Sequence, residues 1–333
     1  MKPPAASTLA IALITAQVVG SSAAAAGPLL DRIKERHAAR QESRQAERGP
    51  GSAEQQLDKP YGDERSPSAA AHRKVLRDLP YGSDPKQRMD VYLPAPGAST
   101  GLAPVIFMVH GGAWRTGDKR MARVVDNKTA RWLPRGLVFV SVNNRLLPEA
   151  DPLDQVHDIA QALAVAQAQA ASWGADPQQF VLMGHSAGAH LVALLAASAT
   201  LGSEAGAKPW LGTVALDSAA LDVLPIMQGK HYKLYDPAFG TDPTFWRAVS
   251  PLQQLQSGAK PVLAVCSSRR TESCDQARAF AAQASQLQVR AQVLPQDLSH
   301  GDINEQLGLP GDYTAAVEGF LSSLSPALAS RLR

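Results

Sequence analysis

The sequence of 333 residues predicts an α/β fold in which a mostly parallel central sheet carries helices on both faces. Short apolar runs rich in β-branched residues recur after residue 75, and Ala-rich stretches of helical length separate them. Near-continuous apolar strands are typical of a parallel sheet, because helices bury both of its faces. The length suits one large domain or two small ones.

The strands and helices follow from these runs in chain order. The stretch 89–93 has polar neighbours and predicts an antiparallel edge hairpin, and 288–294 predicts the last strand. The predicted buried strands between them are 105–109, 137–142, 180–183, 213–216 and 261–265. The predicted helices are 156–173, 188–200, 275–286 and 313–324.

The first 75 residues differ in composition from the rest of the chain. Residues 1–26 combine Lys2, an apolar run and a series of alanines that ends at Ala26, the pattern of a secretory signal peptide. The apolar run is shorter than the roughly 20 residues that span a membrane. We therefore expect an exported protein, periplasmic or secreted, with no integral membrane span after signal removal. Residues 27–75 are polar and predict a mobile tail, or alternatively a cap over the site, before a catalytic domain at 76–333.

The formal net charge is +3, and the positions of the charged residues argue against a nucleic-acid partner. The positive excess lies in Lys2 and residues 27–75, so the predicted folded domain is close to neutral. A nucleic-acid-binding domain carries a basic face, and none is visible here. The sequence has no H-E-x-x-H, paired C-x-x-C or Walker motif, so we expect neither a metal nor another cofactor.

A glycine-flanked serine stands at a strand-to-helix junction. Gly184-His-Ser-Ala-Gly188 follows the apolar run 180–183 and opens a predicted helix. A sharp turn at this place needs glycines and projects the serine hydroxyl from the top of the sheet. The pattern predicts Ser186 as a nucleophile.

A second glycine pair follows the strand 105–109, in His110-Gly-Gly-Ala-Trp114. Acyl transfer builds negative charge on a carbonyl oxygen, and fixed backbone N–H groups stabilise that charge. Glycines allow the backbone to approach closely enough to do so. We expect this loop to face the serine.

With these two motifs the sequence resembles the α/β-hydrolases, specifically the hormone-sensitive-lipase-like and bacterial feruloyl-esterase-like carboxylesterases, with kynurenine formamidases as relatives. The resemblance extends over about residues 75–325 and includes four further stretches: 89–94, 142–149, 173–177 and 250–251. It implies the α/β-hydrolase fold and a serine hydrolase that cleaves carboxylic esters through an acyl-enzyme on Ser186.

By position, the resemblance also implies the oxyanion hole. Its donors are the backbone N–H groups of Gly112, Ala113 and Ala187. Ala113 replaces a glycine found in many relatives, and Asn144 replaces their usual tyrosine. The backbone N–H of residue 113 is still present when alanine replaces glycine there.

A serine at its ordinary pKa needs a general base, which near neutral pH is usually histidine. In this fold the order along the chain is serine, acid, histidine. Only His231 and His300 follow Ser186 at a distance, and His300 lies between the last predicted strand and the final helix. We favour His300 as the base and assign His231 to the surface or the pocket.

The acid that orients His300 has three candidates. Relatives carry it in the turn after the strand 261–265, where Glu272 is the nearest carboxylate, so Glu272 is the favoured acid. Asp275 is expected to begin the next helix, where the helix dipole explains it. Asp217, at the end of the preceding strand, is the third candidate.

The two cysteines of the chain, Cys266 and Cys274, bracket this turn. An exported chain meets an oxidising compartment, so we expect a disulfide between them. It would close a loop of about eight residues and contribute about 2.5 kcal/mol.

The predicted substrate is a small-molecule ester with a short-chain or aromatic acyl group, because the irregular connection 222–260 carries five aromatic rings. These rings either line the pocket or anchor the connection. Two other functions stay open: an arylformamidase-type amidase, and a non-catalytic hydrolase-fold binding protein.

Overall fold

The computed structural model describes residues 74–98, 101–198 and 200–333. The predicted signal peptide and nearly all of the predicted tail lie outside the described residues. The first strand begins at Lys74, so the last two residues of the segment 27–75 form part of the sheet.

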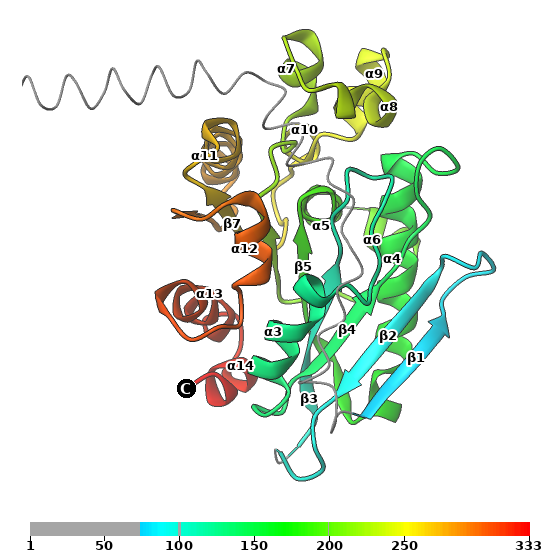
Figure 1. The fold of residues 1–333 in the computed structure, drawn as a ribbon, viewed down its shortest axis with the longest axis vertical. Helices are drawn as coiled ribbons and strands as arrows, with labels where there is room; N and C mark the ends of the chain where they lie inside the picture. Colours follow the sequence, from blue (N-terminus) through cyan, green and yellow to red (C-terminus); the bar gives the residue numbers. More distant parts are fainter. Residues whose placement is uncertain (1–73, 99–100, 199) are drawn as a thin grey trace, which may run out of the picture. The chain divides into compact units, whose positions relative to one another are not determined.

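Eight strands form one sheet in the order β1-β2-β4-β3-β5-β6-β7-β8. Figure 1 shows β1 and β2 side by side at one edge of the sheet. β1 and β2 run antiparallel to their neighbours, and all pairs from β4 to β8 are parallel. The predicted parallel sheet with an antiparallel edge hairpin is therefore confirmed. The strands are β1 (Lys74–Pro80), β2 (Arg88–Leu93), β3 (Ala103–Val109), β4 (Val138–Val142), β5 (Ala175–His185), β6 (Gly212–Leu216), β7 (Val262–Ser267) and β8 (Ala291–Gln296).

Alternate side chains of each central strand enter two separate hydrophobic cores. In β3, Val105, Phe107 and Val109 pack in one core. That core also contains residues of three helices: α4 (Pro152–Gln169), α5 (Ala187–Ala197) and α11 (Thr271–Gln286). Ile106 and Met108 pack in the other core. It contains residues of α3 (Ala122–Trp132), α12 (His300–Glu305), α13 (Asp312–Ser322) and α14 (Pro326–Arg331). This alternation follows from the two-residue period of a strand and buries both faces of the sheet.

The helices named above, and the shorter ones between them, have the following bounds. They are α3 (Ala122–Trp132), α4 (Pro152–Gln169), η1 (Ala170–Trp173), α5 (Ala187–Ala197), α6 (Leu201–Glu204), α7 (Val223–Gln228), η2 (Lys233–Tyr235), α8 (Asp236–Phe239), α9 (Pro243–Ala248), α10 (Pro251–Gln254), α11 (Thr271–Gln286), α12 (His300–Glu305), α13 (Asp312–Ser322) and α14 (Pro326–Arg331). In the part of the chain that the structure describes, no helix is long and apolar enough to cross a membrane.

Two differences from the predicted elements affect the site. α11 begins at Thr271, four residues before the predicted start at Asp275. His300 is the first residue of a short helix instead of a loop residue, and Ser299 caps that helix by accepting from the Asp302 N–H.

The pairing of β3 with β5 brings the two glycine motifs together. Val109 lies opposite Gly184 in the register, so the chain leaves both strands at the same edge of the sheet. The first turn of α5 then crosses directly over the end of β3. A Cβ atom added to Gly188 would lie 2.4 Å from the His110 carbonyl oxygen and 2.5 Å from that of Val109. Only glycine permits this approach.

We predict that Gly188→Ala lowers the free energy of unfolding by about 2 kcal/mol, because the added methyl group overpacks rigid backbone. Chemical denaturation monitored by circular dichroism measures the change. The control is Gly319→Ala on the exposed side of α13, where a Cβ meets nothing within 4 Å. That change should stabilise the protein by about 0.5–1 kcal/mol. Equal effects of the two changes would contradict the packing argument.

Candidate active site

Ser186 occupies the junction between β5 and α5 in a conformation that few non-glycine residues adopt. Its φ is 56° and its ψ is −119°. The backbone N–H of Ser186 donates to the Leu216 carbonyl of β6 at 2.9 Å, which holds the turn against the neighbouring strand. Strained backbone of this kind persists only where the surroundings enforce it, and it clusters at functional sites.

The loop after β3 presents its backbone to the same cavity as Ser186. Gly112, Ala113 and Ala187, the oxyanion donors that the resemblance implies, all line this cavity. Ala113 and Trp114 have φ values of 50° and 60°, so the loop is held in two successive left-handed conformations.

Side-chain hydrogen bonds hold this loop in place. Trp114 Nε1 donates to His190 Nδ1 at 3.1 Å, and the Nε2–H of His190 donates to the Val249 carbonyl at 2.7 Å. Gln155 Nε2 donates to the Trp114 carbonyl. His190 is thus a structural residue that ties the loop to the connection before β7. Among the described residues, no group of three or more His, Cys, Asp and Glu side chains could hold a metal ion.

His300 stands at the start of α12, next to the end of β6. The structure brings it to the cavity that Ser186 lines. The Nε2–H of His185, the residue before the nucleophile, donates to the His300 carbonyl at 2.9 Å, and the two imidazole rings lie 4.5 Å apart. Burial, followed by the proximity of His300, holds the pKa of His185 well below its ordinary value, so His185 remains a neutral donor.

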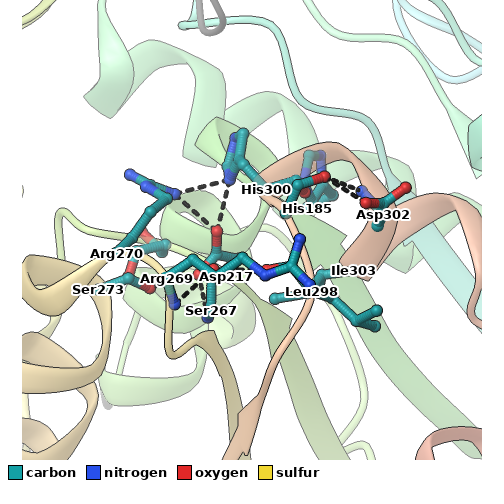
Figure 2. Close-up of polar contacts among 12 residues, drawn as sticks. His185, Asp217, Ser267, Arg269, Arg270, Ser273, Leu298, His300, Asp302 and Ile303 are labelled. Carbon is teal, nitrogen blue, oxygen red and sulfur yellow. Dashed lines mark hydrogen bonds and ion pairs between the residues drawn. The ribbon is translucent and has the colours of Figure 1, made fainter. Parts of the chain in front are cut away.

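The acid that contacts His300 is Asp217, the residue after β6. His300 Nδ1 lies 2.6 Å from Asp217 Oδ2 (Figure 2). The same oxygen accepts from Arg270 Nη1 at 2.6 Å. Oδ1 accepts from the Ser267 N–H at 2.7 Å and from the Ser273 hydroxyl at 2.5 Å. The four donors occupy the four acceptor positions of the carboxylate.

Burial by itself would raise the pKa of Asp217. The hydrogen bond from His300, the positive charge of Arg270 and the hydrogen bond from Ser273 outweigh burial, so the pKa of Asp217 lies well below its ordinary value. The group is therefore ionised near neutral pH, and it can stabilise a protonated His300.

The favoured choice of Glu272 as the acid is corrected by these contacts. α11 starts earlier than expected, so Glu272 lies in the first turn of a helix with its side chain 43% exposed. Its carboxylate lies 3.4 Å from Arg270 Nε, and no described contact joins it to His300. Asp275 is also exposed and pairs with Arg278. Of the three candidates, Asp217 is the one whose carboxylate contacts His300.

Arg270, Ser267 and Ser273 were not singled out from the sequence. All three lie between Cys266 and Cys274, which form a disulfide in the structure. The loop that this disulfide closes therefore supplies three of the four donors to Asp217. The position of the two cysteines around the turn was the one sequence feature that could have indicated them.

The cavity at the site is small and partly enclosed. It holds about 30 Å³. Leu234 and Tyr235, from the connection between β6 and β7, form part of its wall. Phe239 packs against Trp114 with ring centroids 4.9 Å apart, so it anchors this connection. His231, the alternative base, bonds Asp236 and the Gly229 carbonyl and does not line the cavity.

Comparison with known proteins identifies the class of this fold. Residues 89–213, from β2 into β6, match the BD-FAE family model. The chain also resembles a solved structure described as a truncated form of a carbohydrate esterase from gut microbiota, with a TM-score of 0.66 and 17% identity over 80% of this chain and 99% of that one. The chain therefore has the α/β-hydrolase fold of solved esterases, as the motifs implied.

Two curated relatives are similar over shorter regions. The isoprenylcysteine alpha-carbonyl methylesterase of Arabidopsis thaliana is 34% identical over 121 residues, which are 36% of this chain and 27% of the relative. Esterase LipQ of Mycobacterium tuberculosis (strain ATCC 25618 / H37Rv) is 29% identical over 202 residues, which are 55% of this chain and 46% of that protein. The matches thus span between about a quarter and a half of these two relatives.

Proposed function

We propose that the chain is a serine esterase that hydrolyses carboxylic esters of small molecules through an acyl-enzyme on Ser186. The observation that carries the proposal is that Ser186, His300 and the buried Asp217 meet at one cavity beside the glycine loop. The esterase names of the relatives and of the structural neighbour support the same chemistry.

The geometry supports a specific division of roles. With the proton of His300 on Nδ1 and directed at Asp217, Nε2 is free to take the proton of the Ser186 hydroxyl. Ser186 Oγ then bonds to the ester carbonyl carbon, and the oxyanion meets the backbone N–H groups of Gly112, Ala113 and Ala187. His300 returns the proton to the departing alcohol. A water molecule, deprotonated by the same nitrogen, releases the acid and restores Ser186.

We predict that Ser186→Ala lowers kcat for short p-nitrophenyl esters by at least about 10⁴-fold. The thermal unfolding midpoint should change little, because the Ser186 side chain makes no hydrogen bond that holds the described structure. Wild-type turnover in this variant would refute the acyl-enzyme.

Two further measurements test the other functions. A comparison of short p-nitrophenyl esters with N-formyl aromatic amines tests for an amidase, and faster cleavage of the formyl amines would assign the chain to the formamide amidases. Failure of a fluorophosphonate probe to label Ser186 would favour a binding protein.

We predict that Asp217→Asn lowers kcat/KM by about 10³- to 10⁴-fold, because an amide neither stabilises the imidazolium nor fixes its tautomer. The matched control is Glu272→Gln, the same change in an exposed carboxylate. It should keep activity at pH 8 within about threefold of wild type, because Glu272 contacts neither His300 nor the cavity. Thermal unfolding of both variants separates loss of fold from loss of chemistry. The reverse order of activities would return the acid role to Glu272.

We also propose that the protein is exported and that the signal peptide is removed near Ala26. The charged, apolar and small-residue pattern of residues 1–26 supports export, and a disulfide between Cys266 and Cys274 suits an oxidising compartment. We predict that protein recovered from the periplasm or medium begins near Gly27 and contains no free thiol. Amino-terminal sequencing and intact mass with and without reduction test this. An uncleaved amino terminus or two free thiols would contradict it.

A further inference from the structure

Arg270 places a permanent positive charge beside the proposed catalytic base. It is the residue before α11, its side chain is 16% exposed, and it lines the active-site cavity. Nη1 lies 2.6 Å from Asp217 Oδ2 and 2.7 Å from His300 Nδ1, so one guanidinium nitrogen meets both the acid and the imidazole (Figure 2).

The chemistry of the three groups determines where the protons lie. A guanidinium only donates and a carboxylate only accepts. The Nδ1 proton of His300 is therefore directed at Asp217, and Arg270 faces the ring as a charge. When His300 accepts a second proton on Nε2, it becomes a cation next to another cation. Asp217 stabilises that state, and Arg270 opposes it.

We propose that Arg270 is a positioning residue that keeps His300 unprotonated in acidic solution, so that the esterase works below neutral pH. The part concerning activity rests on the proposed function, whereas the effect on His300 does not.

Other charged and titratable groups near His300 do not cancel this effect. Asp217 is ionised and already shares its Oδ2 with Arg270. Glu272 acts in the opposite direction to Arg270 but is exposed, so solvent and salt screen it. His185 is neutral and presents its N–H to the His300 carbonyl. Asp302, on the same helix as His300, is hydrogen-bonded to Ser299.

The balance lowers the pKa of His300 from its ordinary value, with burial as the largest cause and the charge of Arg270 as the next. A base catalyst must be unprotonated, so activity rises with pH through the pKa of His300. Loss of the Arg270 charge should move this rise to higher pH. Loss of the Glu272 charge should move it to lower pH.

The experiment measures His300 directly and does not need turnover. Full-length mature protein carrying Ser186→Ala is labelled with ¹⁵N-histidine, and the imidazole resonances are titrated by NMR over the pH range in which circular dichroism stays native. The spectrum of His300→Asn assigns the signal of His300. Arg270→Met, Arg270→Lys and Glu272→Gln are then compared in the Ser186→Ala background.

Arg270→Met should raise the pKa of His300 by about one unit or more, and Glu272→Gln should lower it by a few tenths of a unit. Arg270→Lys keeps the charge and should leave the pKa below that of Arg270→Met. With Ser186 restored, the acidic limb of the kcat/KM profile should move in the same directions.

An unchanged or lowered pKa of His300 in Arg270→Met would overturn the proposal. Equal pKa values of His300 in Arg270→Lys and Arg270→Met would also overturn it. If Arg270→Met does not fold, Arg270→Gln replaces it as the neutral variant, and an unchanged or lowered pKa of His300 in Arg270→Gln would overturn the proposal. Shifted resonances in a protein without esterase activity would refute the proposed function alone.

Discussion

The buried carboxylate of Asp217 is the constraint on which the rest of the site depends. An ionised carboxylate removed from water costs several kcal/mol unless donors and opposite charge compensate it. Here the compensation comes from three places: His300 at the start of α12, Arg270 with Ser273 at the start of α11, and the N–H of Ser267 at the end of β7. Satisfying one charge therefore fixes the relative positions of the segments that follow β6, β7 and β8.

The nucleophile and the oxyanion loop are fixed by a different kind of force, the close packing of backbone. Gly188 rests on the end of β3, and the register of β3 with β5 places both motifs at one edge of the sheet. Electrostatic compensation thus organises the base and the acid, while steric contact organises the serine. The cavity lies where the two arrangements meet.

The parts of this structure that sequence predicts are those with a local physical cause. Apolar runs defined the strands, and the glycines around Ser186 defined the junction, because both patterns reflect nearby packing. The acid could not be chosen in this way. Asp217 and Glu272 are 55 residues apart, and the choice depended on where α11 begins and on which carboxylate contacts His300. Such contacts form only when the sheet is assembled, so the spacing of residues along the chain does not predict them. Residues 1–73 lie outside this comparison.

The loop between Cys266 and Cys274 has a consequence for how this protein can evolve. Because it supplies three donors to one carboxylate and is closed at both ends by a covalent bond, it cannot change in length without releasing the acid. The part of the β6–β7 connection between Asp217 and Val249 does not have that restriction: it contributes Leu234 and Tyr235 to the cavity wall and none of the four donors to Asp217. New substrate preferences can therefore arise by insertion and deletion in one loop, while the other keeps the chemistry constant.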